Sequence, residues 1–171
     1  MLRNKRLLDI NVDESVRSWR AAAWTAGGTA AIILRDSNDA SARRIVEHLI
    51  SEVSKDPKYG VERVYRKPEI SELQGFSNAD FVLALKPGFK FGRKLHGPVL
   101  VPRTGGTHGY LPVVEDMDAA FFIVGPGITR GRSLGRIHMR DVAPTLASIL
   151  SIELPRAEGR DVLSMLRGTN Q

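Results

Sequence analysis

The stretch Gly27-Gly28-Thr29-Ala30-Ala31-Ile32-Ile33-Leu34 sets the fold class, because a short apolar run follows two glycines directly. This pattern predicts a strand over 29–34 that is introduced by a tight turn. Asp39 or Ser41 can cap a following helix, and the apolar residues of that helix fall at helical spacing: Ile45, Val46, Leu49, Ile50 and Val53. A strand over 61–65, a short helix opened by Pro68 and a strand over 81–85 continue the alternation. The sequence therefore predicts an α/β fold.

The second half of the chain predicts fewer regular elements. Residues 86–118 show little helical period and are expected to form a long ordered segment. Residues 119–124 are apolar at every position, which favours a buried central strand that ends at Gly125-Pro126-Gly127. Asp141 is expected to cap a helix that tolerates Pro144 in its first turn, buries Leu146, Ile149 and Leu150, and precedes a last helical turn over 161–166. No repeat or linker is evident, so 1–171 is interpreted as a single domain with a soft division near residue 95, into 1–95 and 96–171.

The clearest chemical candidate is His108, in the loop Gly105-Gly106-Thr107-His108-Gly109-Tyr110. Glycines on both sides allow sharp bends and close approach to a ligand, and a neutral imidazole is a common zinc ligand. The alternative is a solvated turn residue. For Thr107 and Tyr110 two interpretations stay open: contact with a bound phosphate group, or hydrogen bonds that hold the loop and orient His108. His48 is expected at the boundary of an amphipathic helix and His138 near a helix cap, so neither is a candidate.

Several motifs occur in a fixed order around this loop: GGTHGYLP at 105–112, MDAAFFIVGPGITRG at 117–131, RDVAPTLASILSIELP at 140–155 and EGRDVL at 158–163. Together they resemble the C-terminal end of the type I phosphodiesterase and nucleotide pyrophosphatase family of the alkaline phosphatase superfamily. TAGGTAAIIL at 25–34 and NADFVLALKPGFKFG at 78–92 resemble the same family more loosely. The resemblance implies part of an alkaline-phosphatase-like α/β/α sandwich whose N-terminal catalytic half is absent.

In that family two zinc ions and a threonine or serine nucleophile split a phosphate ester, and the histidine of the GTHGY motif is a zinc ligand. The resemblance thus implies that His108 is a metal ligand, with Thr107 and Tyr110 beside it. The nucleophile and the other ligands have no counterpart here, so no catalytic residue is assigned. One imidazole is too few for a zinc site. We therefore expect this chain to be the C-terminal part of a metal-dependent phosphodiesterase or phosphate-ester hydrolase, inactive alone and completed by an N-terminal half. The alternative is that the chain is a stand-alone, non-catalytic remnant that binds a partner chain or a phosphorylated ligand.

The composition of the chain narrows the classes of function and the cellular location that remain open. At 171 residues, 42% hydrophobic and 26% charged, the chain can bury a core, and the absence of cysteine excludes disulfides and thiolate zinc sites. The net charge of +6 suits a small phosphate ester, but the basic residues are dispersed, so nucleic acid is not expected as the primary partner. The N-terminus lacks the apolar segment of a signal peptide, and no apolar run is long enough to span a membrane, which predicts a cytoplasmic chain unless a missing N-terminal half carries an export signal. The larger aromatics are expected in the core, with Phe89 or Phe91 as possible cleft residues: Trp19, Trp24, Phe76, Phe81, Phe89 and Phe91.

Overall fold

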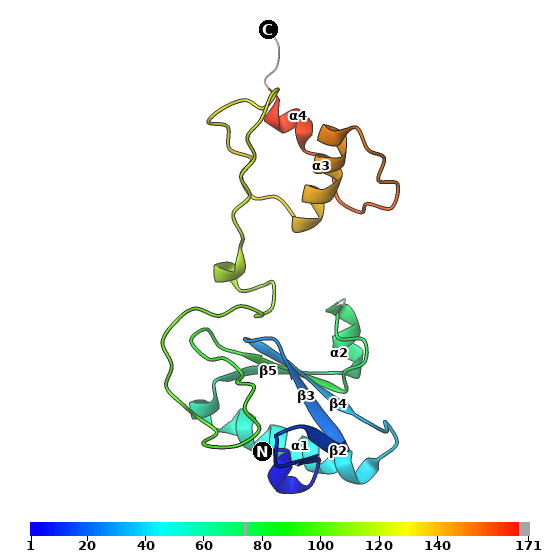
Figure 1. Ribbon diagram of the computed structural model, residues 1–171, viewed down its shortest axis with the longest axis vertical. Coiled ribbons are helices and arrows are strands. Elements are labelled where there is room, and N and C mark those ends of the chain that lie inside the picture. Colours follow the sequence, from blue (N-terminus) through cyan, green and yellow to red (C-terminus); the bar gives the residue numbers. More distant parts are fainter. Residues whose placement is uncertain (74, 168–171) are drawn as a thin grey trace. The chain divides into compact units, whose positions relative to one another are not determined.

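The computed structural model describes residues 1–73 and 75–167 of a mixed α/β chain (Figure 1). The chain divides into two compact units, Met1–Asp118 and a second that begins at Ala119. The soft division expected near residue 95 therefore falls inside the first unit. No helix among the described residues has the length and apolarity needed to cross a membrane.

A four-stranded antiparallel sheet forms the centre of the first unit. Its strands are β3 (Ala21–Thr25), β4 (Thr29–Leu34), β5 (Val61–Arg66) and β6 (Phe81–Leu85), in the order β3-β4-β6-β5. Strands β3 and β4 form a hairpin whose register runs from Ala21 opposite Leu34 to Thr25 opposite Ala30. A separate hairpin, β1 (Leu8–Ile10) with β2 (Val16–Trp19), precedes it. The strands expected over 29–34, 61–65 and 81–85 are confirmed.

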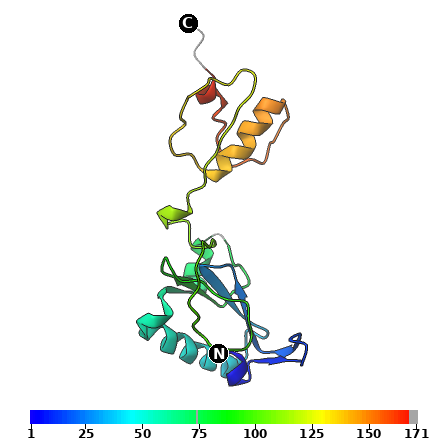
Figure 2. The same cartoon turned by 60° about the vertical axis from the view of Figure 1, so that its left-hand side comes forward.

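Helix α1 (Ala40–Lys55) covers one face of this sheet (Figure 2). Asp39 begins the helix, because its carboxylate accepts a hydrogen bond from the Ala42 N–H at 2.9 Å. The expected apolar face is confirmed, and it packs on alternate residues of β4 and β6 to form the main core: Leu7, Ala21, Ile32, Leu34, Ala42, Val46, Leu49, Ile50, Val53, Phe81 and Leu83.

The opposite face of the sheet is only partly covered. Helix α2 (Lys67–Glu72) opens with Pro68, as expected, and buries Ile70 against Ala31 and Val82. Trp24 was expected in the core, and this prediction is wrong, since its side chain is 73% exposed. The reason is its place on β3, the strand at the edge of the sheet, which has a neighbour on one side only.

The second unit contains α3 (Val142–Leu150), preceded by the 3-10 turn η4 (Met139–Asp141), and α4 (Leu163–Leu166). Pro144 stands in the first turn of α3, and the expected turn over 161–166 is present as α4. The prediction that Leu146 and Leu150 are buried is wrong: they are 40% and 66% exposed, and the fully buried side chain of α3 is Thr145. In an apolar helix the pattern alone does not select the face that finds a partner.

The buried central strand expected over 119–124 is also wrong. The structure has no strand there, and Phe122 and Val124 are 87% and 93% exposed. A strand needs a neighbouring strand to pair its backbone groups, and every strand among the described residues belongs to the first unit. The long segment over 86–118 has no strand and only one 3-10 turn, η3 (Glu115–Met117), in agreement with the expectation.

Candidate functional site

The loop that carries His108 rests on the turn between β3 and β4. The Gly28 N–H donates a hydrogen bond to the His108 carbonyl at 2.9 Å, and the Thr29 hydroxyl donates to the Gly109 carbonyl at 2.8 Å. The turn itself is closed by the Ala26 N–H, which donates to the Thr29 carbonyl at 2.9 Å. The bonds from Gly28 and Thr29 join segments about 80 residues apart, so the loop is held by the hairpin rather than by its own sequence.

Three glycines make this contact possible, because a side chain at any of them would overlap the other segment. A Cβ on Gly27 would collide with the His108 carbonyl, and one on Gly28 with the Tyr110 ring. A Cβ on Gly109 would overlap the Ala26 carbonyl oxygen, and Gly109 has φ +75°, a left-handed conformation that glycine adopts at little cost. The docking of the two segments therefore requires glycine at positions 27 and 28 of TAGGTA and at position 109 of GTHGY.

Tyr110 and Thr107 both lie against this turn and are half-buried. The Tyr110 hydroxyl donates a hydrogen bond to the Phe89 carbonyl at 2.7 Å, which fixes the ring over Gly28. The Thr107 Oγ1 lies 2.9 Å from the position of a Cβ on Gly27. The phenol of Tyr110 thus has a structural partner within the first unit.

The His108 side chain is exposed, and within the described part of the chain its imidazole has no hydrogen bond and no ion pair. Its backbone is fixed by Gly28 while its ring is free. The imidazole is therefore accessible to a ligand, but within the described residues it lacks the hydrogen-bond partner that usually fixes the orientation of a metal-bound histidine.

The other ligands of a zinc site do not accompany His108. Over residues 1–73 and 75–167, no group of three or more His, Cys, Asp and Glu side chains lies close enough to hold a metal ion. His48 pairs with Glu52 at 3.5 Å, and His96 pairs with Glu14 at 3.1 Å. His138 is exposed at the start of η4, as expected of a residue next to a cap. The donor set present here does not fit a zinc ion by itself.

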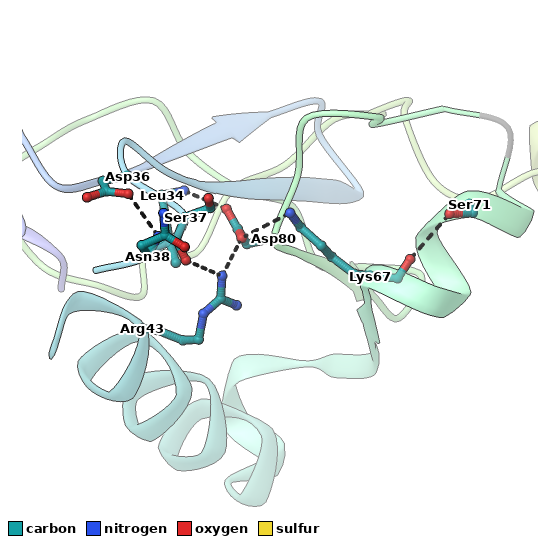
Figure 3. Close-up of polar contacts among 8 residues, drawn as sticks. All are labelled: Leu34, Asp36, Ser37, Asn38, Arg43, Lys67, Ser71 and Asp80. Carbon is teal, nitrogen blue, oxygen red and sulfur yellow. Dashed lines mark hydrogen bonds and ion pairs between the residues drawn. The ribbon is translucent and has the colours of Figure 1, made fainter. Parts of the chain in front are cut away.

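Sequence reasoning missed a buried carboxylate, Asp80, at the start of β6 (Figure 3). Its Oδ1 accepts a hydrogen bond from Arg43 Nη2 at 2.7 Å, and its Oδ2 accepts one from the Leu34 N–H at 2.8 Å. Lys67 Nζ lies 3.8 Å from Oδ1 on the other side. Asp80 thus ties α1, β4 and the start of α2 together. An acidic residue directly before a wholly apolar strand was the available signal, since such a residue is buried only when it is paired.

The RDVAPTLA and EGRDVL motifs meet in the second unit at a second buried carboxylate, Asp141. Its Oδ1 accepts from the Arg160 N–H at 2.8 Å and its Oδ2 from the His138 N–H at 3.1 Å. The Arg160 hydrogen bond, more than the others, holds the pKa of Asp141 below its usual value, against the opposing effect of desolvation. Thr145 extends the network: its hydroxyl donates to the Asp141 carbonyl at 2.6 Å and accepts from the Val162 N–H at 3.0 Å. This polar core explains both motifs structurally.

Comparisons of the chain with protein-family models, with curated proteins and with solved structures found no match.

Proposed function

We propose that this chain is the C-terminal part of a metal-dependent phosphodiesterase or phosphate-ester hydrolase, and that His108 is its contribution to the zinc site. The observation that carries the proposal is the docking of the GTHGY loop on the TAGGTA turn, which fixes the His108 backbone and leaves its imidazole exposed. Two motifs that resemble the same family are thus spatial neighbours. Thr107 and Tyr110 support the loop in this proposal.

A complementary N-terminal half would supply the nucleophile and the other metal ligands. The apolar segment 119–124 supports this proposal, because the side chains of Phe122 and Val124 are exposed to solvent and a partner that covers them would remove apolar surface from water. In the proposed assembly, an alkaline-phosphatase-like α/β/α sandwich, the complementary half covers these residues. The net charge of +6 favours an anionic phosphate ester as the substrate.

Reconstitution tests this proposal. If the coding region upstream of Met1 in its native context encodes a half with a Thr or Ser nucleophile and several Asp and His, that half is mixed with this chain and zinc. We expect hydrolysis of a bis-aryl phosphate only in the mixture. His108→Ala should abolish the activity, whereas His138→Ala, at another exposed histidine, should retain it.

Two outcomes would contradict the proposal. If His108→Ala leaves the reconstituted activity unchanged, His108 is not a ligand. If no complementary half exists in the native context, the alternative is favoured, namely a non-catalytic remnant that binds a partner chain or a phosphorylated ligand.

A further inference from the structure

Both ends of the segment 92–106 are tied to the same turn of the first unit. Just before it, the Phe91 N–H donates a hydrogen bond to the Gly27 carbonyl at 2.8 Å. Just after it, the His108 carbonyl accepts a hydrogen bond from the Gly28 N–H at 2.9 Å. Residues 92–106 therefore form a closed loop that leaves the β3–β4 turn and returns to it. Closed surface loops of this kind frequently carry function.

Loop 92–106 is exposed to solvent along its whole length. Every residue in it is exposed, and an added Cβ at any of its glycines would meet no atom within 4 Å. Within the part of the chain that the structure describes, its backbone N–H and C=O groups have no hydrogen-bond partner. Its one polar side-chain contact there is that of His96, whose Nδ1 lies 3.1 Å from a Glu14 carboxylate oxygen. The other side chains of the loop are therefore available to a partner.

Three consecutive aliphatic residues lie in this loop. Val99, Leu100 and Val101 are 59%, 44% and 54% exposed. Single apolar residues are normal on a protein surface, but a continuous exposed run is typical of a surface that binds a partner. The partner must therefore offer an apolar environment to these side chains.

The charged residues of the loop are all cations. Arg93, Lys94 and Arg103 lie on either side of the aliphatic run, and their side chains have no ion pair or hydrogen bond among the described residues. No Asp or Glu occurs between Asp80 and Glu115. A partner of complementary charge is therefore anionic.

We propose that loop 92–106 binds the surface of a membrane that contains anionic phospholipid. The cations attract the negative headgroups, and the aliphatic side chains enter the boundary between headgroups and acyl chains. The backbone groups of the loop still need hydrogen-bond partners, which water and headgroup oxygens supply only at the interface. The loop therefore lies at the membrane surface and does not cross the hydrocarbon core.

The absence of internal hydrogen bonds favours a membrane over a protein as the partner. A protein interface depends on two surfaces of complementary shape, and no backbone hydrogen bond fixes the shape of this loop. A fluid lipid surface adapts to the loop, and it supplies negative charge and apolar volume side by side. The proposal does not depend on metal binding by His108, which lies outside the loop.

Co-sedimentation of the full chain with sucrose-loaded vesicles tests the proposal. We expect binding to mixed vesicles of phosphatidylcholine and phosphatidylserine, little binding to phosphatidylcholine alone, and a decrease in binding as added salt screens the charges. Lys94→Gln and Arg103→Gln should each weaken binding roughly fivefold. Lys55→Gln, at an exposed cation of α1, removes the same charge elsewhere and is the matched control, which should change binding little.

Val101→Ser tests the apolar contribution. Val124→Ser, at an exposed valine of the second unit, is its control, and we expect only Val101→Ser to weaken binding. Far-UV circular dichroism shows whether the variants fold. In the wild-type chain, the mixed vesicles should also slow trypsin cleavage after Arg93, Lys94 and Arg103, whereas phosphatidylcholine vesicles should not.

Three outcomes would overturn the proposal. The first is a wild-type chain that does not sediment with the mixed vesicles. The second is binding that Lys55→Gln weakens as much as Lys94→Gln, because net charge alone would then explain it. The third is a loop whose substitutions weaken assembly with a complementary half while vesicles are not bound, which would make the partner a protein.

Discussion

Gly109 shows how a single residue can link two distant segments. Its missing side chain leaves room for the Ala26 carbonyl, and its φ of +75° is unfavourable for other residues. We expect Gly109→Ala to destabilise the first unit by about 1–2 kcal/mol from the backbone conformation alone, and further through the collision. Urea unfolding followed by tryptophan fluorescence measures the change, because both tryptophans, Trp19 and Trp24, lie in the first unit.

Gly106→Ala is the control for this prediction. Gly106 lies in the same loop, without a positive φ and with no atom within 4 Å of an added Cβ. Its substitution should change the free energy of unfolding by less than about 0.5 kcal/mol. Equal effects at the two positions would show that the loop does not dock on the β3–β4 turn.

Asp80 is the second residue whose role depends on contacts between elements. In Asp80→Asn the amide oxygen can accept from either Arg43 or the Leu34 N–H, but the side chain no longer offers two acceptors. We expect a loss of about 1–3 kcal/mol, because a buried donor is left unpaired. Thermal unfolding measures this loss, with Glu47→Gln, at an exposed residue of α1, as the control. An effect at Asp80 no larger than that at Glu47 would contradict the structure.

At the scale of elements, the beginning of α1 combines a helix cap with an ion pair. The hydrogen bonds from Arg20, followed by that from the Ala42 N–H, lower the pKa of Asp39 to about 2. A carboxyl whose pKa is lower in the folded chain than in the unfolded chain stabilises the fold above the unfolded value of 3.8, and this stabilisation is lost as the pH falls toward 2. The stability of α1 on the sheet should therefore decrease over this interval.

Asp39→Asn isolates this effect, since asparagine is also a good N-cap residue but carries no charge. We expect the wild-type chain to be the more stable at neutral pH, and the difference from Asp39→Asn to shrink between pH 4 and pH 2. Urea midpoints of both proteins across this range measure the difference. A difference that does not change with pH would show that the Arg20–Asp39 pair does not contribute to folding.

At the scale of the whole molecule, we expect the isolated chain to show no metal-stimulated hydrolysis of a bis-aryl phosphate. His108 brings one imidazole, and two-metal hydrolysis needs several ligands and a nucleophile. Release of the aryl alcohol, measured with and without added zinc, tests this. Zinc-dependent turnover that is lost in His108→Ala would overturn the prediction and point to ligands outside those recognised in the sequence.

The sequence by itself determined the elements that a local pattern specifies. The apolar run after Gly27-Gly28, the capped helix from Asp39 and the strand at 81–85 were predicted correctly, because turn chemistry, capping and periodicity act within a few residues. The glycine-flanked loop at His108 was also recognisable from its own residues. These features need no knowledge of distant contacts.

Only the tertiary structure decided which faces and segments found partners. Residues 119–124 have the composition of a buried strand, yet Phe122 and Val124 stay exposed. Trp24 lies at a sheet edge, and Thr145 rather than Leu146 is the buried residue of α3. The docking of His108 on the Gly27–Gly28 turn and the pairing of Asp80 with Arg43 join residues far apart in the chain. Burial and pairing depend on what lies opposite a residue in space, and that neighbour is not part of its local sequence.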